Sequence, residues 1–193
     1  MSQAPKILAF AGSTREASFN KRLVKVAAEG ARSAGAEVTV IDLRDFPMPL
    51  YDGDLEAESG LPDNVRKLKA LFMEHQGLLI ASPEYNGGIS AVLKNTIDWV
   101  SRSEGDEGAL VAYKDKVAGL MAASPGRLGG LRGLPDVARI LTGIGVLVLP
   151  QQYALGGAGQ AFGDDGGLTD SAAEAAVTGI GARVARTILA LKQ

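Results

Sequence analysis

The chain has 193 residues, few enough for one domain, because a single core can grow to about 250 residues before a chain splits. Its 46% hydrophobic and 22% charged residues exclude the low-hydrophobicity, high-charge composition of disordered chains. A formal charge of -2 argues against nucleic acid and anionic membranes as partners, and the absence of cysteine excludes disulfides, thiolate catalysis and thiolate-bound metals.

The N-terminal segment gives no sign of export. Met1 to Pro5 leads straight into an apolar run and lacks the basic, apolar and small-residue regions of a secretion signal. No apolar stretch reaches about 18 residues, the length needed to span a bilayer. We therefore expect a cytoplasmic protein that does not insert into membranes.

The first elements form a strand, helix, strand unit. Lys6 to Ala11 and Glu37 to Asp42 are short apolar runs, the second rich in β-branched residues, and both are predicted as strands. Asn20 to Ala34 carries apolar residues at helical spacing, and Gly35 follows it as a C-terminal cap would.

The same pattern continues in the middle of the chain. After an acidic connection at Met48 to Gly60, a helix is predicted over Leu61 to His75 and a buried strand over Gly77 to Ala81. A further helix covers Ser90 to Arg102, with Trp99 on its apolar face. We expect Trp99 in the core and His75 in contact with the helix C-terminus, with no catalytic part.

The last alternations complete the sheet. Lys116 to Ala123 is predicted as a strand, Leu131 to Thr142 as a helix and Val146 to Leu149 as a fifth strand. Near-continuous apolar strands that alternate with helices indicate a parallel sheet covered on both faces.

The C-terminal part begins with a glycine-rich segment, Gly156 to Gly167, predicted as an irregular surface loop or a mobile lid. Ser171 and Glu174 have the spacing of a capping box that opens a long helix. The residues of this helix predicted to face the core are Val177, Ile180, Val184, Ile188 and Leu191.

The loop after the first strand, Gly12 to Leu23, is rich in hydroxyls and leads into a helix N-terminus, where unpaired N–H groups and the helix dipole favour an anion. The polar candidates in it are Ser13, Thr14, Arg15, Ser18 and Asn20. The alternative is that Ser18 or Asn20 only caps the helix and that Arg15 is a solvated surface charge. The loop has neither a G-x-G-x-x-G pattern nor a P-loop, so a monophosphate is the expected ligand.

The loop after the third strand begins at Ser82. Pro83 fixes an extended turn, Tyr85 offers a flat aromatic wall, and Gly87 with Gly88 lets a ring approach the backbone. The alternative is an ordinary turn with Tyr85 in the core. We favour a site role for Tyr85.

The loop after the fourth strand, Ser124 to Gly133, contains four glycines and two arginines. Its backbone amides could lie against a polar ring edge, and Arg127 or Arg132 could meet a phosphate. The alternative is a flexible surface turn. Ligands of open parallel sheets bind beyond the carboxyl ends of the strands, so the three loops are expected to share one site.

The loops carry GSTREASFN, PEYNGGISAVLKNTIDWVSR and SPGRLGGLR, and in this order they resemble the NADPH-dependent FMN reductase family. This flavodoxin-like group includes azo, quinone and chromate reductases. The resemblance implies a single FMN-binding domain over residues 1–193, a three-layer α/β/α sandwich whose five-stranded parallel sheet has the order 2-1-3-4-5. It implies that Ser13, Arg15, Ser18, Phe19 and Asn20 hold the FMN phosphate, that Pro83, Glu84, Tyr85, Asn86 and Gly87 line the isoalloxazine, and that Ser124, Gly126 and Arg127 meet its other edge.

The implied activity is transfer of electrons from NADPH or NADH, by a ping-pong mechanism, to a quinone, azo compound, free flavin or chromate. No side chain is expected to be catalytic and no metal is expected, because the flavin carries the chemistry. A homodimer or homotetramer is expected. One alternative is a flavodoxin-type electron carrier, although a charge of -2 is small for an acidic docking face. Another is a flavin-free binding module, since fold alone does not determine function.

Overall fold

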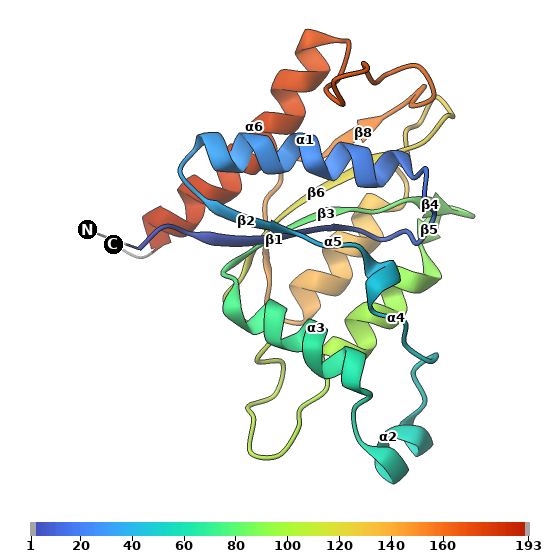
Figure 1. The fold of residues 1–193 in the computed structure, drawn as a ribbon, viewed down its shortest axis with the longest axis vertical. Coiled ribbons are helices and arrows are strands. Elements are labelled where there is room, and N and C mark those ends of the chain that lie inside the picture. Colours follow the sequence, from blue (N-terminus) through green and yellow to red (C-terminus); the bar gives the residue numbers. More distant parts are fainter. Residues whose placement is uncertain (1–2, 192–193) are drawn as a thin grey trace.

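The computed structural model describes residues 3–191, which form a three-layer α/β/α sandwich (Figure 1). The central sheet has the order β2-β1-β3-β6-β7, and β8 pairs with β6 beyond the end of β7. All its strand pairs are parallel. Its strands are β1 (Lys6–Ala11), β2 (Glu37–Val40), β3 (Gly77–Ala81), β6 (Val117–Ala123), β7 (Leu147–Val148) and β8 (Tyr153–Leu155). The predicted fold and strand order are confirmed, and β8 is an addition that is too short to show a period in the sequence.

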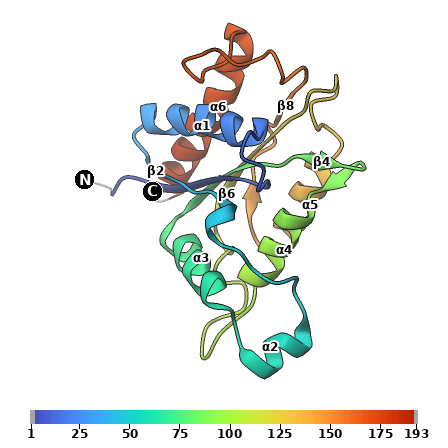
Figure 2. The ribbon, with the colours of Figure 1, turned by 45° about the vertical axis from the view of Figure 1, so that its right-hand side comes forward.

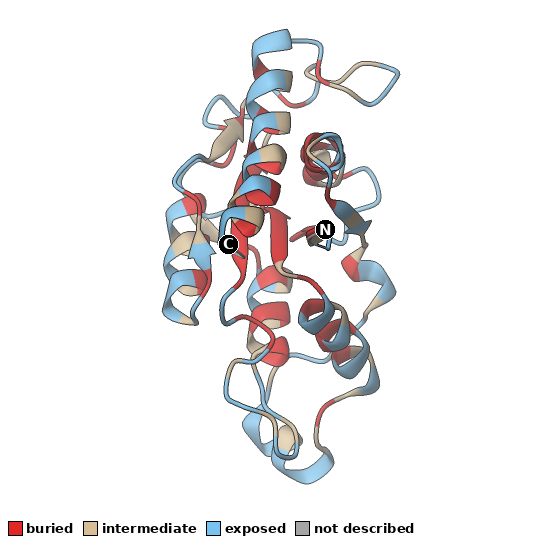
Figure 3. Ribbon diagram, turned by 90° about the vertical axis from the view of Figure 1, so that its left-hand side faces the viewer, coloured by how far each residue is buried: buried red, intermediate tan, exposed pale blue. Residues whose placement is uncertain are grey.

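Helices cover both faces of the sheet, and the buried residues in Figure 3 lie on the sides of these helices that face it. On one face lie α1 (Phe19–Ser33) and α6 (Ser171–Leu191), and on the other α3 (Asp63–Glu74), α4 (Ala91–Val100) and α5 (Leu134–Gly143) (Figure 2). The smaller elements are the 3-10 helix η1 (Leu43–Asp45), α2 (Gly53–Ser59) and the hairpin of β4 (Glu84–Tyr85) and β5 (Gly88–Ile89). No helix within residues 3–191 is both long and apolar enough to cross a bilayer.

Two glycines let α1 and α6 pack in direct backbone contact. A Cβ atom added at Gly181 would lie 1.8 Å from the Ala27 carbonyl oxygen, and one added at Gly30 would lie 2.0 Å from the Thr178 carbonyl oxygen. Real Cβ contacts are never this short, so any side chain at either glycine would force the helices apart.

The last helix opens at Ser171 as predicted, but its predicted cap is wrong. Ser171 is its first residue, and the Asp170 carboxylate accepts hydrogen bonds from the N–H groups of Ala172 and Ala173 at 2.8 and 3.2 Å. An aspartate is as good an N-cap as a serine, so the local pattern could not choose between neighbouring positions. The prediction that Leu191 faces the core is also wrong, because this residue is 64% exposed at the helix end.

Two expectations about single residues are confirmed. Trp99 is fully buried, and its Nε1 donates a hydrogen bond of 2.9 Å to the Pro49 carbonyl. His75 ends α3, and its Nδ1 lies 2.6 Å from the Leu71 carbonyl oxygen in the last turn of that helix.

Candidate functional site

The three polar loops leave neighbouring strands at the same edge of the sheet. Ala11 pairs with Ala81 at the carboxyl ends of β1 and β3, and Ala81 pairs with Met121, two residues before the end of β6. The next residues continue the pairing, since Gly12 N donates to Ala81 O at 2.9 Å and Ser82 N to Met121 O at 2.8 Å. Segments that are far apart in sequence therefore form one continuous edge, where ligands bind in sheets of this type.

The first loop surrounds a small hollow of about 80 Å³. Ser18 occupies the N-cap position of α1, yet its side chain makes no capping hydrogen bond within the described part of the chain. Its hydroxyl and the first N–H groups of α1 are therefore available to an anion. Arg15 lies exposed at the rim of the same hollow. The residues that line it are Ser13, Arg15, Ser18, Phe19, Asn20, Pro83, Glu84, Tyr85, Ala123, Ser124 and Pro125.

Asn20 joins the first loop to the end of β6. Its Nδ2 donates to the Ala123 carbonyl and its Oδ1 accepts from the Ala123 N–H, both at 2.9 Å. The residue is buried, so this pair of bonds defines the position of the first turn of α1 against the end of β6. One Nδ2 hydrogen remains for a ligand, so the side chain serves first as a brace.

The second loop is a two-residue hairpin. Asn86 and Gly87 have φ values of 53° and 81°, positive at both positions as a type I′ turn requires. The Asn-Gly pair in the sequence is a strong signal for this turn and could have predicted the hairpin. Tyr85 is 53% exposed, so the alternative that placed it in the core is wrong.

Ser90 ties this second loop to the first. Its Oγ accepts a hydrogen bond from Leu93 N at 3.3 Å and donates one of 2.6 Å to the Gly12 carbonyl. The first bond caps α4. The bond to the Gly12 carbonyl holds the start of the first loop in position, because Ser90 is buried and cannot exchange this partner for water.

Glu84 and Arg132 join the second loop to the third. The Glu84 carboxylate accepts hydrogen bonds from the Arg132 backbone N–H at 3.0 Å and from its Nε at 2.8 Å. The Glu84 side chain is only 8% exposed, whereas that of Arg132 is 65% exposed. Arg132 is thus paired with Glu84 and does not line the hollow of the first loop, and it neutralises the carboxylate beside the site.

We expect a double-mutant cycle to show this coupling. Glu84→Gln and Arg132→Gln should each destabilise the protein, and the double variant should lose less than the sum of both. The coupling free energy should be about 1 kcal/mol, because solvent screens the exposed guanidinium. Urea unfolding of the four proteins measures it. Strict additivity would show that the pair does not hold the loops together.

The third loop encloses a second hollow of about 320 Å³. It shares Glu84 and Ser124 with the first hollow, and Asn86, Gly126 and Arg127 line it as well. The described structure thus brings every predicted cofactor contact except Gly87 to one of these two hollows. No neighbour lies within 4 Å of a Cβ placed at Gly87, which sits at the open tip of the hairpin.

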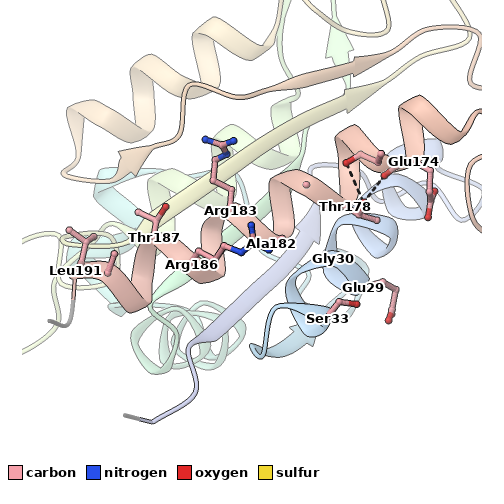
Figure 4. Close-up of a pocket in the computed structure, with 13 residues that line it drawn as sticks. Glu29, Gly30, Ser33, Glu174, Thr178, Ala182, Arg183, Arg186, Thr187 and Leu191 are labelled. Atoms are coloured by element: carbon pink, nitrogen blue, oxygen red, sulfur yellow. Dashed lines mark hydrogen bonds between the residues drawn. The ribbon is translucent and has the colours of Figure 1, made fainter. Parts of the chain in front are cut away.

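A wider depression of about 1030 Å³ lies elsewhere, on the outer side of α1 and α6 (Figure 4). Its charged residues are mixed in sign, with Glu29 and Glu174 against Arg183 and Arg186. None of the three loops contributes to it. Because the depression lies apart from the three loops, its size does not make it the candidate site.

Comparison with known proteins identifies the family. Residues 5–160 match the family model of NADPH-dependent FMN reductase. The chain belongs to this family. A quinone reductase of Pseudomonas putida is 31% identical to it, and the match covers 88% of each chain. A quinone reductase of Escherichia coli is also 31% identical, and that match covers 81% of this chain and 80% of the relative.

Among solved structures, the flavoenzyme NAD(P)H:(acceptor) oxidoreductase FerB of Paracoccus denitrificans superimposes with a TM-score of 0.81 at 25% identity. The match covers 96% of this chain and 98% of FerB. This FMN reductase is therefore a flavodoxin-like oxidoreductase with FMN as cofactor and NAD(P)H as electron donor. The donor set agrees, because serine hydroxyls, helix N–H groups and an arginine suit a phosphate monoester.

Proposed function

We propose that this FMN reductase oxidises NAD(P)H and reduces a quinone, with azo compounds, free flavin and chromate as further acceptors. The observation that carries the proposal is the convergence of the three loops on two joined hollows, one rich in anion donors and one open to solvent. The quinone reductases among its relatives support the choice of acceptor.

The donors of the first loop would hold the FMN phosphate. Ser13, Arg15, Ser18, Phe19 and Asn20 all line the smaller hollow, and they would offer two hydroxyls, a guanidinium and the first N–H groups of α1. When bound, FMN supplies the ability to accept a hydride and to pass electrons on. The chain contributes binding, orientation and electrostatics.

The second and third loops would hold the ring. The segment Pro83 to Asn86 lines one side, with Tyr85 as an exposed aromatic surface, and Ser124, Gly126 and Arg127 line the other. Backbone dipoles of the third loop could stabilise negative charge at the ring edge, so no acid, base or nucleophile is assigned. We also propose a homodimer or homotetramer, consistent with the 53% exposure of both Leu128 and Leu131 beside the ring site.

We predict parallel double-reciprocal plots when NAD(P)H is varied at several fixed quinone concentrations. One open face would serve donor and acceptor in turn, and such substitution gives ping-pong kinetics. Steady-state rates measure this. Intersecting lines, with both substrates shown to be bound together, would contradict the shared face.

An electron carrier of the flavodoxin type would behave differently. It would hold the same flavin, but NADPH would bleach the flavin absorbance slowly or not at all. A stopped-flow mixing experiment with NADPH alone separates the two functions, and we expect rapid bleaching.

A further inference from the structure

The glycine-rich segment between β8 and α6 is an ordered strap, defined here as residues 161–169. Phe162 and Leu168 form an antiparallel bridge, and Thr169 N donates to Ala161 O at 3.0 Å. The base of the strap is anchored, because Leu168 N donates to the Glu174 carboxylate at 2.8 Å and the Leu168 side chain is buried. The match to the family model ends at residue 160, just before the strap.

The base of the strap also docks on the first turn of α1. The Phe162 ring stacks on Phe19, with centroids 6.4 Å apart and planes 8° from parallel. The Arg22 guanidinium lies 4.3 Å from the centroid of the Phe162 ring, and its Nη2 donates to the Gly163 carbonyl at 3.2 Å. Phe162 therefore contacts two residues one turn apart on α1.

These contacts lie next to the candidate phosphate site, on the side of Phe19 that faces away from the hollow. Phe19 is the first residue of α1, and it lines the hollow beside Ser18 and Asn20. Phe162 is absent from that lining, so it touches Phe19 from outside the hollow. Asn20 holds the first turn of α1 to β6, and the strap holds the same turn to α6.

We propose that Phe162 is a positioning residue for the FMN phosphate, which acts by fixing the first turn of α1. This inference rests on the phosphate site assigned under Proposed function. Docking of the strap and binding of a phosphate are then coupled, and the coupling works in both directions. A flavin with a phosphate should hold the strap down, whereas a flavin without one should not.

The test compares FMN with riboflavin, which has the same ring but no phosphate. Purified wild-type protein, Phe162→Ala, Phe162→Tyr and the control Asp164→Ala are equilibrated with each flavin, and bound flavin is measured by fluorescence quenching. Asp164 is an exposed residue of the same strap. Phe162→Ala should weaken FMN binding about ten-fold, through loss of an aromatic stack and a cation–π contact. Riboflavin binding should change less than about two-fold, and Phe162→Tyr and Asp164→Ala should bind FMN normally.

Hydrogen exchange of the strap amides supplies a readout independent of catalysis. In the wild type, FMN should slow exchange at Gly163, Leu168 and Thr169, whose N–H groups are hydrogen-bonded within the strap or to Glu174, and riboflavin should not. Equal weakening of both flavins in Phe162→Ala would overturn the proposal, as would faster strap exchange with unchanged FMN affinity. If the wild type binds FMN no more tightly than riboflavin, the phosphate site itself is wrong, and the strap proposal falls with it.

Discussion

Gly181→Ala should destabilise the protein by about 3 kcal/mol or more, the upper range for overpacking in a well-packed interior. The added methyl would lie 1.8 Å from the Ala27 carbonyl oxygen and 2.8 Å from the Ala31 nitrogen. These are backbone atoms of α1, so no side-chain rotation can relieve the clash and the helices must separate. Urea unfolding followed by far-UV circular dichroism measures the change.

Gly179→Ala is the matched control on the same helix. Gly179 is exposed, and apart from the adjacent backbone of its own helix no described atom lies within 4 Å of a Cβ added there. Alanine should therefore stabilise the protein by about 0.5–1 kcal/mol through its higher helix propensity. Gly30→Ala, which would clash with the Thr178 carbonyl from the other helix, should behave like Gly181→Ala. Equal effects of the Gly179 and Gly181 variants would show that the helices are not in close backbone contact.

Arg15→Ala should weaken FMN binding by about ten-fold to somewhat over a hundred-fold. Loss of a hydrogen bond to a charged group costs about 1.5–3 kcal/mol, which corresponds to this range. Riboflavin affinity should barely change, because Arg15 lines the hollow that contains the free Ser18 hydroxyl and not the hollow of the third loop. Titration of both proteins with both flavins, followed by quenching of flavin fluorescence, gives the four affinities.

Salt and a second basic residue serve as controls for Arg15. The FMN penalty should shrink as ionic strength rises, because Arg15 is exposed and its charge is screened. Lys25→Ala, which removes an exposed charge of α1 outside both hollows, should leave FMN affinity unchanged. If Arg15→Ala weakens FMN and riboflavin equally, the residue acts on the loop or the ring. If it weakens neither, Arg15 is only a surface charge.

Much of this molecule could be predicted because its pattern is local. β1 and β3 show their burial directly as apolar runs, and their predicted bounds agree with the structure. The polar loops that follow them stand out because they interrupt such runs. The Asn-Gly pair at Asn86 and Gly87 is also a local signal that indicates a turn. The sequence gives no such signal for α2, which lies in an acidic connection, because its first turn is capped by Asp52 and none of its residues is buried.

The sequence by itself therefore determined the alternation of strands and helices, the flavodoxin-like sheet and the three loops that carry the candidate site. Only the tertiary structure decided which side chains form the hydrogen bonds that hold these loops in place. Asn20 is hydrogen-bonded to Ala123, which is 103 positions away in the sequence. Glu84 is bonded to Arg132, 48 positions away, and Arg22 to Gly163, 141 positions away. The physical reason is that periodicity reports whether a residue is buried or exposed, whereas a hydrogen-bond partner from another strand or loop depends on sheet order and register, which bring distant segments together.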